Sequence, residues 1–127
     1  MEKAYKVLYL DEKNSLWSYC KQSGIPIEFQ RFARRYYRTK WNHAKKENIK
    51  NGYGLLVFDN VNSANTSLSW STKYRLFEVE VDKLYCPSPK LTMLQNGITF
   101  FAPFPWPEHT KMCNKLRIVR EIEGFHK

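Results

Sequence analysis

The sequence contains little that could form a disulfide framework, a zinc site or a standard nucleotide-binding loop. Its three cysteines, Cys20, Cys86 and Cys113, are widely spaced, and no Cys-x-x-Cys pair is present. An odd, scattered set argues against disulfides and against a zinc ribbon, so we expect reduced thiols with packing roles. The five glycines form neither Gly-x-x-x-x-Gly-Lys-Ser/Thr nor Gly-x-Gly-x-x-Gly, which excludes both standard nucleotide-binding fingerprints.

Long apolar stretches are also missing. No run approaches the roughly 18 apolar residues that a membrane span needs. The sequence opens with charge at Glu2, Lys3 and Lys6, and neither a hydrophobic segment nor a cleavage site follows. We therefore expect a cytoplasmic protein without a membrane partner.

Residues that could carry catalysis or bind a metal are few. His43, His109 and His126 lie in a basic stretch, a proline-rich loop and the end of the sequence, and none has a catalytic motif around it. No His-x-x-x-His pair or acidic cluster is present. Glu78 and Glu80 share one face of a predicted strand, where a solvated face is the expected role. We predict no catalytic residue, no metal site and no cofactor.

The chain is rich in apolar, aromatic and basic residues. Of its 127 residues, 43% are hydrophobic and 16% aromatic, which is enough apolar surface for one folded domain spanning 1–127. Its 21 basic residues outnumber 12 acidic ones, so the net charge is +9. Residues 31–50 alone carry eight basic side chains against the single Glu47. Such charge attracts phosphates or an acidic protein surface.

Runs of strand-forming residues predict an α+β fold built on a twisted antiparallel sheet with one or two helices. Residues 4–10 and 16–19 are expected to form a hairpin, because residues 11–14 have turn chemistry. Residues 74–81 alternate between apolar and polar, which predicts a strand with one solvent-facing side. The remaining expected elements are strands at 54–59, 98–102 and 116–122, and loops at 86–89 and 103–107. A short helix through Ala64 to Leu68 is also expected, with Asn60 or Asn62 as its cap.

The basic segment is ambiguous between helix and strand. Its apolar residues fall at helical i, i+3, i+4 and i+7 spacing: Phe29, Phe32, Ala33, Tyr36, Tyr37, Trp41 and Ala44. This spacing favours a helix that ends near Asn51 and Gly52. Residues 32–37, however, are aromatic enough to form a strand instead.

The same segment has the composition of a nucleotide-binding site. Its cations, interleaved with Phe32, Tyr36 and Tyr37, are Arg31, Arg34, Arg35, Arg38, Lys40, Lys45 and Lys46, and Trp41 lies among them. Arginine forks bind phosphate oxygens bidentately, and aromatic faces stack on bases. This chemistry serves nucleic acid and small nucleotides equally well. The alternative is a solvated helix face with an aromatic side towards the core.

Five short motifs, taken in order, resemble those of a family of small phage proteins. They are Tyr5-Lys6-Val7, Gly54-Leu55-Leu56-Val57-Phe58-Asp59 followed by Ala64, residues 74–81, Trp106-Pro107-Glu108-His109-Thr110, and residues 116–122. The order is similar to that of the Thoeris anti-defence sponge family, whose members bind and sequester cyclic ADP-ribose signals made by bacterial immune enzymes. The sequence departs from the family pattern at His109, where the family has glycine, and at Arg117, where it has lysine.

The resemblance implies a non-catalytic phage protein in the host cytoplasm that sequesters a cyclic nucleotide or cyclic ADP-ribose. It also implies a homo-oligomer, and strand structure within residues 29–41. Together with the basic and aromatic composition, it gives these candidate ligand-binding residues: Arg34, Arg35, Arg38, Trp41, Phe77, Phe101, Trp106, Arg117 and Arg120.

Three other functions remain open from the sequence. Nucleic-acid binding explains the basic segment directly. An ADP-ribosyltransferase-like enzyme would use Glu80 as its catalytic carboxylate and Tyr5 or Tyr9 as a nicotinamide wall. An inhibitor of a host protein would dock its basic face on an acidic surface.

Overall fold

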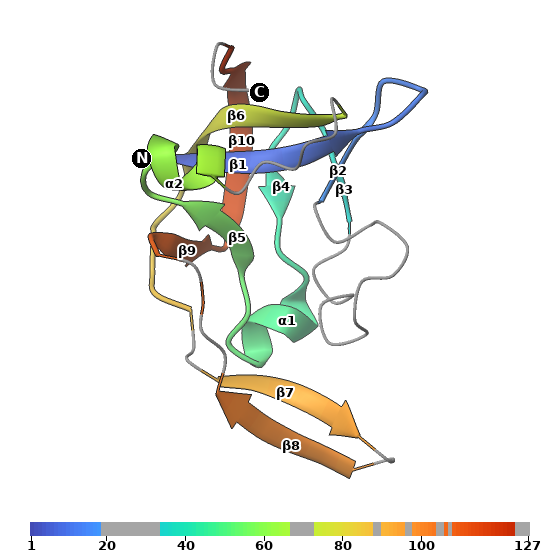
Figure 1. The fold of residues 1–127 in the computed structure, drawn as a ribbon, viewed down its shortest axis with the longest axis vertical. Coiled ribbons are helices and arrows are strands. Elements are labelled where there is room, and N and C mark those ends of the chain that lie inside the picture. Colours follow the sequence, from blue (N-terminus) through green and yellow to red (C-terminus); the bar gives the residue numbers. More distant parts are fainter. Residues whose placement is uncertain are drawn as a thin grey trace.

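The computed structural model describes residues 1–18, 34–66, 73–87, 90–95, 98–103, 106 and 108–123. Antiparallel strands dominate these residues, and two short helices accompany them (Figure 1). Neither of these helices is long and apolar enough to cross a membrane. The elements in chain order are β1 (Glu2–Leu10), β2 (Leu16–Ser18), β3 (Arg35–Tyr36), β4 (Asn42–His43), α1 (Lys46–Lys50), β5 (Leu55–Phe58), α2 (Val61–Thr66), β6 (Tyr74–Val81), β7 (Lys90–Gln95), β8 (Ile98–Pro103), β9 (Thr110–Cys113) and β10 (Lys115–Glu121).

The two long strands β1 and β6 form the centre of the main sheet. They pair antiparallel from Glu2 opposite Val81 to Tyr9 opposite Tyr74. The strand order is β3-β2-β1-β6-β10-β4, and β5 joins the sheet through β1 and β9. β7 and β8 form a separate two-stranded sheet, which Figure 1 shows as a hairpin at one end of the molecule.

Apolar side chains cover both faces of the β1–β6 pair. Leu8, Phe77 and Val79 belong to the larger core cluster on one face. Val7 and Leu76 belong to a second cluster on the other face, which includes Ala64 of α2. Full burial of each such large side chain is worth about 1.5–3 kcal/mol. The pair therefore contributes buried side chains to both core clusters.

A buried asparagine fixes the turn between β3 and β4. Asn42 is only 2% exposed. Its Oδ1 accepts a hydrogen bond from the backbone N of Tyr37 at 2.8 Å, and its Nδ2 donates to the carbonyl oxygens of Tyr37 at 3.0 Å and Lys40 at 3.2 Å. Nδ2 also lies 3.4 Å from the carbonyl oxygen of Leu116 in β10. One side chain therefore holds the turn in shape and attaches it to the sheet.

Most of the predicted strands are present. The N-terminal hairpin is β1 and β2, and the other expected strands correspond to β5, β6, β8 and β10. Of the two expected helix caps, the structure has Asn60, whose Oδ1 accepts hydrogen bonds from the backbone N of Asn62 at 2.9 Å and of Ser63 at 3.1 Å. Residues 67 and 68 of the expected helix lie outside the described residues. The prediction of an antiparallel sheet with helices is confirmed in outline, although the helices have only five and six residues.

The helix expected through the basic segment is wrong over residues 34–45. This stretch forms β3, a turn and β4, and helix begins only at Lys46. The spacing of the apolar residues wrongly indicated a helix. Tyr36 is buried within strand β3, whereas Trp41 lies in the turn before β4. The strand that the resemblance implied is present at Arg35–Tyr36. Residues 29–33 lie outside the described part of the chain.

The expectation of a solvent-facing side on β6 is wrong for most of the strand. On that side Leu76 is 2% exposed and Glu78 is 8% exposed. The second core cluster covers Leu76, and two cations cover the Glu78 carboxylate. β7 and β9 were not predicted, and residue 103, expected in a loop, is the last residue of β8. Residues 88, 89, 104, 105 and 107 of the expected loops lie outside the described residues.

We predict that Asn42→Ala lowers the free energy of unfolding by about 2–4 kcal/mol, because it leaves buried backbone groups of the turn without partners. Asn51→Ala is the matched control, since the exposed Asn51 side chain donates one hydrogen bond to the Glu47 carbonyl oxygen. The control should lose about 0.5 kcal/mol or less. Urea denaturation measures both. Equal losses in the two variants would contradict the role given to Asn42.

Candidate ligand-binding surface

Cationic and aromatic side chains gather where the β3–β4 turn meets β10. We call this set the basic aromatic surface, and its members are Arg35, Tyr37, Arg38, Lys40, Trp41, Lys115 and Arg117. Arg35 lies on β3, four members lie in the turn between β3 and β4, and two lie on β10. The Asn42 hydrogen bonds hold the turn, so the surface rests on a fixed backbone.

Tyr37 forms the first cation–aromatic group of this surface. The Arg35 guanidinium carbon is 4.9 Å from the centre of the Tyr37 ring, and the Lys40 Nζ is 4.2 Å from it. Tyr37 is 39% exposed, and both cations are exposed. The ring is therefore accessible from solvent and has two cations beside it.

Trp41 forms the second group. The Lys115 Nζ is 4.8 Å and the Arg117 guanidinium carbon 5.1 Å from the Trp41 ring centre. β4 and β10 pair with Leu116 opposite Asn42, so the continuing register places Arg117 opposite Trp41. Lys115 and Arg117 are two residues apart on one strand and share a face. The pairing of these strands thus brings two cations from the C-terminal part of the chain to Trp41.

The side chain of Arg34 forms hydrogen bonds with backbone groups of the protein. Its Nη1 donates to the His43 carbonyl oxygen, and its Nε donates to the Arg35 carbonyl oxygen at 3.2 Å. Its guanidinium carbon also lies 4.9 Å from the centre of the buried Tyr36 ring. Arg34 therefore links β3 to β4, although it was predicted as a ligand-binding residue.

The cations on the adjoining sheet face are paired with carboxylates. Arg120 Nη2 donates to Glu78 Oε1 at 3.1 Å, and Lys3 Nζ is 3.7 Å from the same oxygen. Arg117 pairs with Glu80. A β-bulge between residues 118 and 120 brings Arg120 opposite Glu78, so both arginines face β6 carboxylates. Arg120 is thereby partly neutralised, and Arg117 is shared between Glu80 and Trp41.

The other aromatic residues of the predicted pocket differ in how far the structure describes them. Phe77 is 1% exposed and belongs to the core, so its ring has no open face for a base, although the exposed Arg38 lies 5.7 Å from its centre. Trp106 is half-buried. Phe101 is in β8, and its side chain lies outside what the structure describes.

Tyr37 and Lys40 were recognised in the basic segment but not selected as site residues, and Lys115 was missed. Lys115 had no signal in the sequence, because only the β4–β10 pairing brings it beside Trp41.

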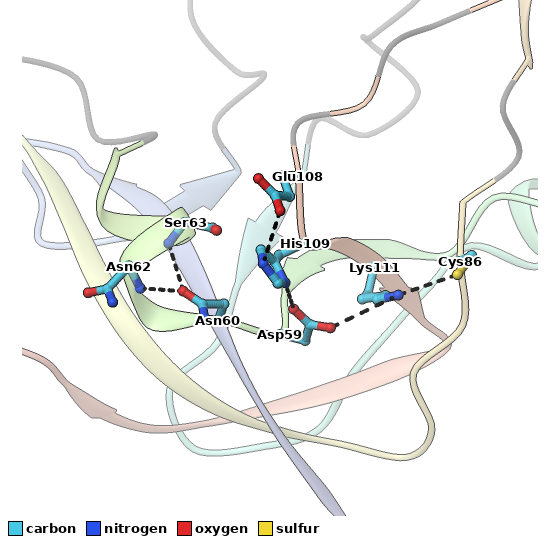
Figure 2. A network of polar contacts seen from close by, with 8 residues as sticks. All are labelled: Asp59, Asn60, Asn62, Ser63, Cys86, Glu108, His109 and Lys111. Atoms are coloured by element: carbon cyan, nitrogen blue, oxygen red, sulfur yellow. Dashed lines mark hydrogen bonds and ion pairs between the residues drawn. The ribbon is translucent and has the colours of Figure 1, made fainter.

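A second polar group lies between the end of β5 and the start of β9 (Figure 2). His109 Nδ1 is 2.8 Å from Asp59 Oδ1, and its Nε2 is 3.6 Å from Glu108 Oε1. Lys111 Nζ lies 4.0 Å from Asp59 Oδ2 and donates to Cys86 Sγ at 3.3 Å. His109 therefore holds Asp59 on one side and Glu108 on the other. Within the described residues, no group of three or more His, Cys, Asp or Glu is arranged to hold a metal ion.

The two described cysteines are free thiols in different environments. Cys86 is exposed, whereas Cys113 is buried. Burial raises the pKa of Cys113 to about 12; nearby Lys6 opposes the shift and Asp82 adds to it. Burial also raises the pKa of Tyr85, with smaller contributions from Cys113 and Asp82. Both groups therefore stay protonated at neutral pH and belong to the packing beside β5 and β9. Cys20 lies outside the described residues.

Comparisons of the chain with protein-family models, curated proteins and solved structures find no match.

We predict that iodoacetamide at pH 8 modifies Cys86 in the native protein and leaves Cys113 unmodified. Only a thiolate reacts, and Cys113 is both buried and protonated. Because its folded pKa is above the ordinary value near 9, ionisation favours the unfolded state, so stability falls as pH rises from about 9 towards 12. Peptide mapping by mass spectrometry, with unfolded protein as the control, measures both sites. Equal labelling of the two thiols in native protein would contradict this assignment.

Proposed function

We propose that this protein binds phosphate-bearing nucleotides at the basic aromatic surface and catalyses no reaction. The observation that supports the proposal most is the charge pattern of the surface. Among the described residues, no carboxylate forms an ion pair with Arg35, Arg38, Lys40 or Lys115, and Glu80 pairs only with Arg117. Uncompensated cations attract anions, and the exposed Tyr37 ring and the half-buried Trp41 ring add a preference for ligands that carry bases.

A small cyclic nucleotide or a cyclic ADP-ribose isomer is the first candidate ligand. It comes from the resemblance to the anti-defence sponge family, which also implies sequestration and a homo-oligomer with shared sites. One structural detail agrees with the family pattern. His109, which replaces the family's glycine, has φ = 68°, a left-handed conformation that glycine adopts at little cost.

Nucleic acid is the second candidate, and the extent of the surface favours it. Four cations of the surface have no carboxylate partner among the described residues, because Arg117 pairs with Glu80, and four positive charges are more than one diphosphate can neutralise. The open arrangement of exposed Arg35, Arg38 and Lys40 suits a ligand that continues past the surface.

The other two functions have less support. An ADP-ribosyltransferase-like enzyme would need Glu80 as a free carboxylate, but Glu80 accepts a hydrogen bond from Arg117. An inhibitor of an acidic host protein would use the cations but would have no particular use for the two rings.

We predict that Arg35→Gln combined with Lys40→Gln weakens nucleotide binding at least tenfold, because it removes both cations beside Tyr37. Arg34 is excluded from the variant, since its loss would also disturb β3 and β4. Lys13→Gln with Lys50→Gln removes the same charge from exposed positions outside the surface and should change affinity less than twofold at 150 mM salt, where screening is strong. Calorimetric titration with a cyclic dinucleotide, cyclic ADP-ribose and a single-stranded oligonucleotide measures the affinities.

The salt dependence of the same titrations separates the two candidate ligands. A polymer that contacts the four unpaired cations should lose roughly a hundredfold or more in affinity between 50 and 200 mM salt, whereas a ligand with one diphosphate loses far less. Failure of all these ligands to bind at 50 mM salt would refute the proposed function. A loss in the control variant equal to that in the Arg35/Lys40 variant would show that net charge, rather than this surface, determines binding.

A further inference from the structure

We infer that the basic aromatic surface holds two consecutive nucleotides of a single-stranded nucleic acid, with one base on Tyr37 and one on Trp41. This inference rests on the proposed function and selects one of its two ligand classes. Its basis is that the surface contains the same arrangement twice. Each arrangement consists of one aromatic ring with two cations within 5.1 Å of the ring centre.

The two rings belong to one short turn. Tyr37 and Trp41 are four residues apart, so even a fully extended chain would separate their Cα atoms by at most about 14 Å. The turn is not extended, because the Asn42 side chain bonds to Tyr37 at one side and to Lys40 at the other. Both rings thus project from one restrained segment, and little ordering is needed when a ligand binds.

The cations beside the rings do not block base stacking. Arg35 and Lys40 are exposed side chains whose contact with Tyr37 is a surface cation–aromatic interaction, the weak form of that contact. A phosphate draws such cations towards itself, and a base that takes their place on the ring gains a stronger stacking interaction. The same exchange at Trp41 moves Lys115 towards a phosphate, while Arg117 keeps its Glu80 partner.

Two rings with two cations each fit a single-stranded nucleic acid better than a mononucleotide or a duplex. A ligand with one base fills one arrangement and leaves the cations of the other without a phosphate. A duplex keeps its bases stacked on each other, so it can offer phosphates but no base faces. An unpaired strand supplies bases and phosphates alternately, as the rings and cations of this surface alternate, and it can continue past the surface. The rings carry no hydrogen-bonding pattern for base edges, so we expect weak sequence preference.

The test compares four probes by fluorescence anisotropy competition at 50 mM salt. The probes are thymidine 5′-monophosphate, the dinucleotide pdTpdT, a single-stranded dT12, and dT12 annealed to dA12. We expect pdTpdT to bind at least tenfold more tightly than the mononucleotide, and dT12 more tightly than the duplex. Equal affinity for mononucleotide and dinucleotide, or tighter binding of the duplex, would overturn the inference.

Two ring variants test the individual positions. Tyr37→Leu and Trp41→Leu should each weaken pdTpdT binding about 5- to 100-fold, which corresponds to one lost stacked base. Trp41→Phe, which keeps a ring for stacking and for packing, should lose less than Trp41→Leu. Tyr9→Leu is the matched control, because Tyr9 also lies beside a lysine, Lys73 at 5.9 Å, but belongs to the second core cluster. Its affinity for pdTpdT should equal that of the wild type.

The outcomes separate this inference from the proposed function. If Tyr37→Leu binds pdTpdT as tightly as the wild type, the second base position does not exist and the inference is wrong. If the protein binds cyclic ADP-ribose or a cyclic nucleotide but none of the strands, the proposed function stands and the inference fails. If no nucleotide binds at all, both fail. Thermal melting of each variant checks that the compared proteins are folded.

Discussion

The pairing of β1 with β6 is the interaction on which the rest of the structure depends. Eight residue pairs join the two strands, and apolar clusters cover both of their faces. A strand buried on both faces cannot slip by one residue without exchanging the environments of all its side chains. β2 and β5 attach to β1, and β10 attaches to β6. The position of β10, and with it that of Lys115 and Arg117, therefore follows from the register of the two central strands.

The sequence was sufficient to predict those strands and helices whose signal lies within a short stretch of residues. β1 and β2 were predictable because a turn-forming stretch separates two runs of strand-forming residues, and α2 because Asn60 can cap it. The basic segment failed because its aromatic residues serve two unrelated purposes. Tyr36 packs into the core from β3, whereas Trp41 packs against cations of β10, and their spacing imitates a helix. What decides the conformation is the Asn42 amide, whose partners include Leu116, 74 residues away.

In the candidate site, too, some residues were predictable from the sequence and others were not. Composition alone identified the segment and its arginines, because phosphate binding needs cations and base stacking needs rings. Composition could not separate Arg34, which donates to backbone oxygens, from Arg35, which stands beside an accessible ring. It also could not find Lys115, which reaches Trp41 only through strand pairing, or show that Phe77 is enclosed in the core. These distinctions depend on tertiary contacts between distant parts of the chain.

The net charge of +9 is distributed in a way that separates structural cations from available ones. On the sheet face, Lys3 and Arg120 share the Glu78 carboxylate, and within the core Lys6 donates to the Leu56 carbonyl oxygen. Lys3 and Arg120 thus have a carboxylate partner, and Lys6 has a hydrogen-bond acceptor inside the protein. Among the described residues, the cations of the β3–β4 turn contact aromatic rings instead of carboxylates, and a ring compensates charge only weakly. A phosphate that approaches the turn therefore gains attraction without breaking an ion pair, which is the physical basis for proposing that anions bind at this turn.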